Sequence, residues 1–168
     1  PSVGTPTTLG PGADLDTFQW RAPPDGQTVT ITVLVSDNFI GSCIDEKSLE
    51  IEVQDLANLG DKVWEDLNYN GIQDTGEPGV AGVIVNLLNS DGSSTGKTTT
   101  TDPDGLYSFT GLIPGDYRVQ FVLPTGYEFT PWNQGADTID SDADGTTGIT
   151  DIINLAPGEN DDTWDAGM

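Results

Sequence analysis

Residues 66–77 combine oxygen-bearing side chains with a spacing that suits a bound metal ion. The segment follows the loop pattern D-x-[DN]-x-[DN]-G-x5-E at every defined position. In such a loop calcium takes six to eight oxygen ligands, and the glycine at position six lets the chain turn sharply. The sequence therefore predicts a calcium site. Its expected ligands are Asp66, Asn68, Asn70, the carbonyl of Ile72, Asp74 and Glu77.

The residues on either side of this loop favour strands, whereas an EF-hand places its loop between two helices. Upstream, residues 60–64 have the pattern of a short strand. Downstream, Pro78, Gly79 and Gly82 would break a helix. We therefore expect a calcium loop set between β-strands. The alternative is a solvated acidic turn, which would have to meet six positional constraints without a metal to explain them.

A second acidic stretch, residues 140–151, repeats the pattern with aspartate in place of glutamate at position twelve. Aspartate is shorter and binds less readily with both oxygens, and Gly148 at position nine offers only a bound water. We expect a second calcium site here, completed from another loop; the alternative is an acidic hairpin. The expected ligands are Asp140, Asp142, Asp144, Asp151 and Asp165, and residues 160–162 would add to this or to a third site.

The composition excludes several classes of protein. The 168 residues carry 28 Asp and Glu against 5 Lys and Arg, which gives a net charge of −23. Such a chain repels nucleic acid and anionic membrane surfaces. It has no His, so His-based catalysis and His-ligated zinc are impossible. No nucleophile–base pair is visible, and the paired carboxylates lie in turns that calcium explains, so we expect no enzyme.

The acidic residues are clustered, which suits divalent cations better than general solubility. Ten of the nineteen acids that follow residue 56 fall within 66–77, 140–151 and 161–165. An acidic chain stabilised by calcium belongs outside the cell, where calcium is plentiful. No apolar run is long enough to span a membrane, and Cys43 has no second cysteine for an internal disulfide. The start at Pro1 suggests a processed product or part of a longer protein.

Short apolar alternations separated by turns predict an all-β protein. Strand spacing of about ten residues without helical periodicity is typical of a β-sandwich, here immunoglobulin-like or transthyretin-like with calcium loops. We expect an extended arm or linker at 1–17, a partial immunoglobulin-like β unit at 18–56, and a calcium-binding β-sandwich at 57–168. The partial unit offers strands at 28–36 and 48–53, which are too few for a whole sandwich.

Within 57–168 the alternation assigns most of the core. Val83, Val85 and Leu87 should point inward, residues 98–101 should form a polar edge strand, and residues 102–105 a type I turn. Further strands are expected at 116–123, 129–132, 150–155 and 163–166, the first with Tyr117, Val119, Phe121 and Leu123 on one face. Trp20, Trp64 and Trp164 fit core positions, and Trp132 is expected at the surface.

Ordered motifs from residue 59 to the last residue resemble one known family. They are Gly60-Asp61-x-Val63-Trp64-x-Asp66-x-Asn68, Gly71-x-Gln73-Asp74-x-Gly76-Glu77-Pro78-Gly79, Thr101-Asp102-x-x-Gly105-x-Tyr107-x-Phe109, Leu112-x-Pro114-Gly115-x-Tyr117, Asp140-Ser141-Asp142 and Asp165-Ala166-Gly167. The chain resembles the B repeats of serine-aspartate-repeat surface adhesins, the SdrD B-like domains. The resemblance implies a calcium-binding β-sandwich, related to collagen-adhesin B domains, that serves as a rigid stalk or spacer at bacterial surfaces.

Two functions from different classes follow as expectations. The first is a structural, calcium-stabilised module of an extracellular or cell-surface protein, acting as a rigid stalk or fibre subunit. The second is a ligand-binding adhesin module for carbohydrate or protein, which should expose an aromatic patch or a groove. The apolar strands of residues 18–56 also predict self-assembly or contact with neighbouring repeats. Either the rest of this unit lies upstream of Pro1, or another copy supplies it and accepts the arm at 1–17 by β-strand addition.

Overall fold

The structure is a computed structural model that describes residues 28–36, 44–52 and 55–168, the first two ranges as strand backbone only. Every regular element in these ranges is a β-strand. None of the described residues form a helix long and apolar enough to cross a membrane. The predicted arm at 1–17, Trp20 and Cys43 lie outside the described residues.

Strands β1 (Thr28–Ser36) and β2 (Ile44–Glu52) pair antiparallel along their whole length, from Thr28 opposite Glu52 to Ser36 opposite Ile44. The predicted strand at 28–36 is confirmed. The second strand begins four residues earlier than Ser48, where its start was expected. Residues 45–47 are all charged and hide the apolar alternation, but their backbone still completes the ladder with β1.

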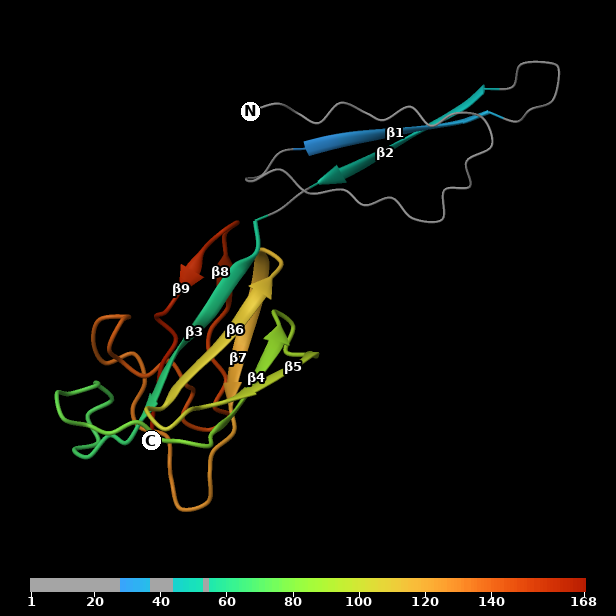
Figure 1. Cartoon of the computed structure of the whole chain (residues 1–168). Coiled ribbons are helices and arrows are strands. Elements are labelled where there is room, and N and C mark those ends of the chain that lie inside the picture. The colour runs from blue at the N-terminus through green and yellow to red at the C-terminus, as the bar shows by residue number, and fades with distance from the viewer. Residues whose placement is uncertain (1–27, 37–43, 53–54) are drawn as a thin grey trace.

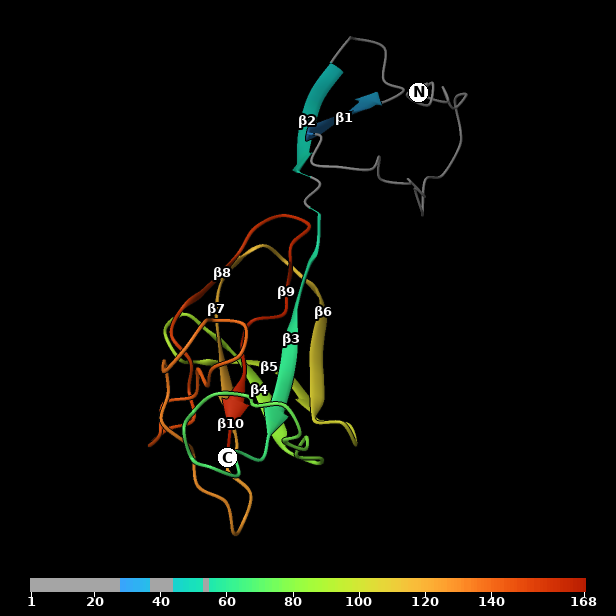
Figure 2. The same ribbon diagram turned by 90° about the vertical axis from the view of Figure 1, so that its left-hand side faces the viewer.

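Residues 55–168 form an immunoglobulin-like β-sandwich of two four-stranded sheets (Figures 1 and 2). The first sheet has the order β10 (Ala166–Gly167), β3 (Ala57–Trp64) and β6 (Leu106–Leu112), with β9 (Asn160–Asp161) also paired to β3. The second has the order β5 (Ser94–Thr100), β4 (Ile84–Asn89), β7 (Gly115–Phe121) and β8 (Ile153–Leu155). β9 and β10 run parallel to β3, and the other pairs are antiparallel.

Alternate residues of both sheets meet in one core. Val83, Val85 and Leu87 are fully buried, as the alternation predicts. Tyr107 stands edge-on to Phe109 of its own strand and to Phe121 of the other sheet, with ring centroids 6.1 Å and 5.5 Å apart. The predicted edge strand is β5, which pairs only with β4 in the described sheet.

The tryptophans that the structure describes follow the prediction. Trp64 is fully buried at the end of β3, and Trp164 is partly buried against the core. Trp132 is 38% exposed. Because Trp64 anchors the strand that leads into residues 66–77, the sandwich fixes where that loop begins.

The predicted strands at 116–123 and 150–155 are present as β7 and β8 with different bounds, whereas others are missing. β7 ends at Phe121, just ahead of Pro124, and leaves Leu123 exposed. Residues 129–132 are irregular, because Pro131 has no N–H for a ladder and Thr130 N donates instead to Gly167 O. The expected strand at 150–155 shortens to β8.

The expected strand at 163–166 is replaced by two separate two-residue strands, β9 and β10. Side chains explain the break between them. The Thr163 hydroxyl and the Trp164 indole N–H both donate to Asp161, at 2.8 Å each, which holds residues 161–164 in a local turn.

Candidate cation sites

The loop at 66–77 leaves the sandwich directly after β3 and turns tightly. Asp66 is buried, whereas residues 67–70 are exposed. Gly71 has a φ of 76° and lies so close to the next loop that a Cβ on it would fall 2.0 Å from the Pro131 carbonyl oxygen. Glycine at position six is therefore required both by the backbone conformation and by the contact.

The side-chain oxygens at positions one, three and five all face backbone N–H groups inside the loop. Asp66 accepts hydrogen bonds from Asn70 N at 3.2 Å and from Gly71 N at 2.7 Å. Asn68 Oδ1 accepts from Asn70 N at 3.0 Å, and Asn70 Oδ1 accepts from Ile72 N at 2.8 Å. The loop thus turns the predicted donor oxygens toward its own interior.

Glu77 closes the loop with both carboxylate oxygens. Oε1 accepts from Leu67 N at 3.0 Å, and Oε2 accepts from Asp74 N at 2.9 Å. Asp74 Oδ2 in turn accepts from the side-chain amides of Asn68 and Asn70, at 2.8 Å and 3.0 Å. Each of the five predicted side-chain ligands is therefore held by hydrogen bonds within the loop.

The donor set is made of oxygen atoms alone, which fits a hard cation such as calcium. In residues 55–168, no three His, Cys, Asp or Glu side chains form a group that would hold a metal by themselves. The loop brings only three carboxylates, those of Asp66, Asp74 and Glu77, so a cation here would also need both asparagines and the Ile72 carbonyl. That mixed set is the one that the sequence pattern predicts.

The loop is joined to the second acidic stretch by backbone contacts. Ile72 and Asp140 form an isolated antiparallel bridge. Gln73 N donates to Ile139 O at 2.6 Å, and Ser141 N donates to Gly71 O at 3.0 Å. Order in one predicted cation-binding segment is thereby coupled to order in the other.

The five residues predicted for a second site fall into two groups. Asp144 is partly exposed and serves a turn, in which its Oδ1 accepts from Thr146 N and from Thr147 N and Oγ1. These hydrogen bonds lower its pKa. Asp151 is exposed. Asp140, Asp142 and Asp165 are buried.

Asp142 and Asp165 are brought together directly before β10. Asp165 N donates to Asp142 Oδ2 at 2.7 Å, and Asp142 N donates to Asp165 O at 2.9 Å. Burial raises the pKa of Asp142 to about 7. Burial, with the charge of Asp61 next in importance, raises the pKa of Asp165 to about 9.

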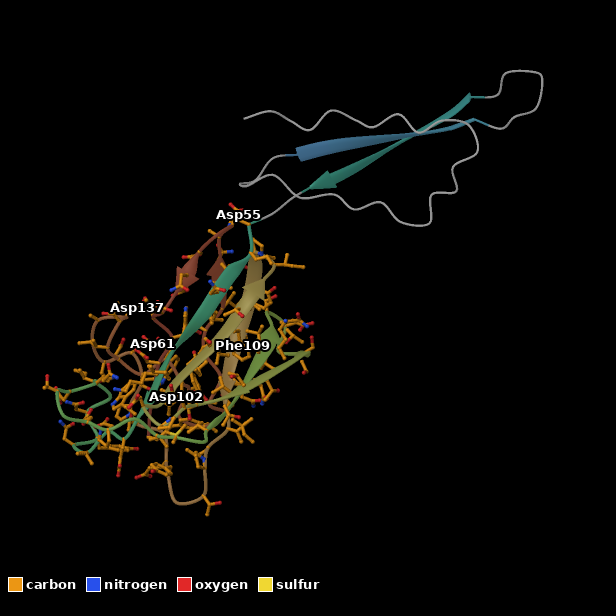
Figure 3. All side chains as sticks on the ribbon, in the orientation of Figure 1. Asp55, Asp61, Asp102, Phe109 and Asp137 are labelled. Carbon is orange, nitrogen blue, oxygen red and sulfur yellow. The ribbon has the colours of Figure 1, made fainter. Side chains whose placement is uncertain are left out.

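Asp61 is a member of this group that sequence reasoning missed. It lies on β3 (Figure 3), close enough to Asp165 for its charge to raise the pKa of that carboxyl. Burial raises its pKa as well. An aspartate within a predicted strand was the available signal, but only the strand pairing shows that it lies beside residue 165. We call Asp61, Asp142 and Asp165 the buried acidic cluster.

Two buried carboxylate oxygens lack a hydrogen-bond donor. Asp165 Oδ1 accepts from Lys62 N at 3.1 Å, but Oδ2 has no partner. Asp140 Oδ2 accepts from Gly135 N at 3.0 Å, but Oδ1 has no partner. A buried carboxylate oxygen without a donor is costly unless it gains a proton or a cation. A cation in this region would therefore need further oxygen ligands beside these two carboxylates.

The model of the SdrD B-like domain matches residues 57–168. The chain belongs to this family. It is 40% identical over 165 residues to serine-aspartate repeat-containing protein D of Staphylococcus aureus strain Newman, a match that covers 98% of the chain and 11% of that protein. It is 42% identical over 150 residues to serine-aspartate repeat-containing protein F of Staphylococcus epidermidis, a match that covers 89% of the chain and 8% of that protein.

The predicted family is thus confirmed, and the chain spans only about a tenth of the length of these curated relatives. As an SdrD B-like domain it is a structural module of cell-surface proteins, and its place is extracellular or on the cell surface.

Among solved structures, the minor pilin GBS52 of Streptococcus agalactiae matches with a TM-score of 0.44 and 12% identity, over 72% of this chain and 52% of the pilin. The major pilin subunit BcpA of Bacillus cereus matches with a TM-score of 0.40 and 16% identity, over 87% and 40%. These likenesses are too distant to bear on the function.

Proposed function

We propose that this SdrD B-like domain is a calcium-stabilised spacer that keeps a surface protein extended and rigid. The observation that carries the proposal is the loop at 66–77, whose predicted ligands lie on one turn held by internal hydrogen bonds. Asp66, Asn68, Asn70, Asp74, Glu77 and the Ile72 carbonyl would hold the cation. Calcium would supply positive charge to a unit that otherwise carries nineteen acidic against three basic residues.

The loop also holds the end of the chain, which ties calcium to mechanical strength. Met168 N donates to Trp64 O at 3.0 Å, and Asp66 N donates to Met168 O at 2.9 Å. The first residue of the loop therefore fixes the last residue of the sandwich. A cation bound by Asp66 would stiffen this junction as well as the loop.

The strand directions suit a load-bearing role. β3 starts at one end of the sandwich, and the C-terminal residue lies at the other, beside the end of β3 (Figure 1). β10 pairs parallel with β3, Ala166 opposite Val63 and Gly167 opposite Trp64. Opposed pulling on residues 57 and 168 would shear these strands, so that several hydrogen bonds must break together instead of one after another.

Force spectroscopy of this domain between identical marker domains tests the proposal. The unfolding force should be higher in millimolar calcium than in a chelator, because the junction of Asp66 with Met168 must loosen before β10 can slide. A calcium titration by calorimetry on the same protein reports binding independently. If calorimetry shows that the protein binds calcium, yet the unfolding force is the same in calcium and in chelator, the spacer mechanism is refuted.

Exposed aromatic side chains favour a ligand-binding role as a second candidate. Tyr69 is 50% exposed, Tyr127 37% and Trp132 38%. Tyr69 also donates its hydroxyl to Phe129 O at 3.1 Å, which places it against the segment that precedes Trp132. A shift of Trp132 fluorescence in an oligosaccharide titration, lost in Trp132→Ala, would support this role.

The strands before residue 55 support the proposal of a neighbour or second copy. In the described part of the chain, β1 and β2 form a two-stranded sheet of their own. Such a pair is marginally stable alone, and both its outer edges offer backbone groups to another strand. Sedimentation of the whole chain in calcium tests this, since a stable monomer with residues 28–52 protected from protease would rule out a need for another chain.

A further inference from the structure

Asn70 precedes Gly71 in the loop, and an asparagine followed by glycine can react with the backbone of its neighbour. Asn70 is exposed, whereas its neighbour Gly71 is buried. A glycine after asparagine has no side chain to hinder attack by its backbone nitrogen on the asparagine amide carbon. Asn68, in the same loop and equally exposed, precedes the bulky Tyr69 instead.

We propose that Asn70 is a site of spontaneous deamidation and that cation binding at the loop controls its rate. The nitrogen of Gly71 forms a bond to Cγ of Asn70 and gives up its proton. The Cγ–Nδ2 bond breaks, and Nδ2 leaves as ammonia after gaining a proton, so that a five-membered succinimide remains. Water then opens the ring at either carbonyl and produces aspartate or isoaspartate, with no oxidant or reductant required.

The hydrogen bonds of the loop place carboxylates at both reacting nitrogens. Asp66 Oδ2 accepts the Gly71 N–H at 2.7 Å and can receive the proton that must leave. Asp74 Oδ2 accepts from Nδ2 of Asn70, the departing nitrogen, at 3.0 Å. Asp66 is therefore positioned as a base on the attacking atom.

A cation would block the same step, an argument that rests on the calcium loop of the proposed function. Asp66 as a ligand would direct its oxygens at the cation instead of at the Gly71 N–H, and Asn70 as a ligand could not rotate its amide carbon toward Gly71. If only the cation-free loop reacts, the rate should fall by the factor 1 + [L]/Kd, about a thousandfold when calcium exceeds Kd a thousandfold. The fraction of deamidated Asn70 would thus increase with the time that the loop spends without its cation.

The two products should act on the loop in opposite directions. Aspartate adds a charged ligand at position five, which strengthens calcium loops. Isoaspartate lengthens the backbone by one carbon directly before Gly71, which packs so closely on the next loop that an added Cβ would fall 2.0 Å from the Pro131 carbonyl oxygen. That product should loosen the contacts of residues 71 and 72 with residues 140 and 141.

The test is incubation of the full 168-residue chain at neutral pH, with calcium or with a chelator, followed by peptide mapping. Each event adds about 1 Da as an amide becomes an acid, and chromatography separates aspartyl from isoaspartyl peptides. Asn68, in the same peptide, is the internal control. Asn70→Gln keeps an amide oxygen but disfavours ring closure, so its loop peptide should keep its mass.

In chelator, Asn70 should convert faster than Asn68, and calcium should suppress the conversion. Conversion of Asn70 no faster than that of Asn68 in chelator would overturn the modification site. Equal conversion with and without calcium, in protein shown by calorimetry to bind calcium, would overturn the control by the cation. If calorimetry detects no calcium binding, the proposed function fails, while the chelator arm still decides the modification.

Discussion

Replacing Glu77 by glutamine tests whether the loop is a cation site or only a turn. Both oxygens of Glu77 face the loop and accept N–H groups. Glutamine keeps the size and one acceptor oxygen, but it removes the negative charge and turns the second oxygen into a donor that faces an N–H. Without calcium the cost should be about 1 kcal/mol, the net value of one hydrogen bond.

With calcium the cost should be larger, because a charged ligand is lost. An interaction with a charged group is worth about 1.5–3 kcal/mol, and a loss near the top of this range, about 2.7 kcal/mol, is a hundredfold weaker Kd. At calcium a thousandfold above the original Kd, the stabilisation by calcium should fall from about 4.1 kcal/mol to about 1.4 kcal/mol.

Denaturant unfolding, followed by tryptophan fluorescence in calcium and in chelator, measures both values. Glu159→Gln is the matched control, since Glu159 also accepts a backbone N–H, that of Ala156, but in a different turn. It should lower stability equally in the two conditions. If Glu77→Gln keeps the full calcium increment of the unaltered protein, then the loop is not where calcium acts.

Three further predictions follow from the same contacts. Calcium should raise the melting temperature relative to chelator, by an amount that grows with its concentration; identical midpoints would exclude a bound cation. In chelator, the free energy of unfolding should fall as pH rises from 5 to about 8. The pKa values of Asp142 and Asp165 are about 7 and about 9 in the folded state but about 3.8 in the unfolded state, so the folded protein binds more protons over this range. A free energy of unfolding that stays constant or rises with pH would contradict this. Gly71→Ala should lower the free energy of unfolding more than Gly92→Ala. Both glycines have positive φ, which costs alanine about 1–2 kcal/mol, but of the two only Gly71 lacks room for a Cβ. Equal denaturant midpoints for the two variants would contradict the close packing at Gly71.

The sequence pattern predicts the sandwich well where one residue in two is buried. Val83, Val85 and Leu87 alternate cleanly, and they lie where the alternation places them. It fails where side chains compete with the ladder for hydrogen bonds. Asp161 accepts hydrogen bonds from Thr163 and Trp164, and Pro131 has no N–H to donate, so two expected strands are lost, although Phe129 and Ala166 within them are still buried.

The two candidate sites also differ in how far the sequence predicts them. The loop at 66–77 is continuous in sequence, so spacing alone identifies each candidate ligand, and whether calcium binds there remains a prediction. The buried acidic cluster joins residues from β3, from the second acidic stretch and from the chain's end. The sequence predicts Asp142 together with Asp140, Asp144, Asp151 and Asp165. In the structure Asp165 hydrogen-bonds to Asp142, and the parallel pairing of β10 with β3 adds Asp61, whereas Asp144 serves a separate turn.

The buried acidic cluster lies beside the β10–β3 pair, where its burial lowers the stability of the fold. A buried carboxyl with a raised pKa opposes folding at neutral pH unless something compensates its charge. Asp165 lies next to β10, the strand that would be sheared when the domain is pulled, and its N–H and side chain bind Asp142 and the backbone of Lys62. A cation there would therefore strengthen the strand pair that bears the load, and without it the same charges would help that pair to separate. Mechanical strength would then depend on extracellular calcium through both acidic regions, joined at Gly71 and Ser141.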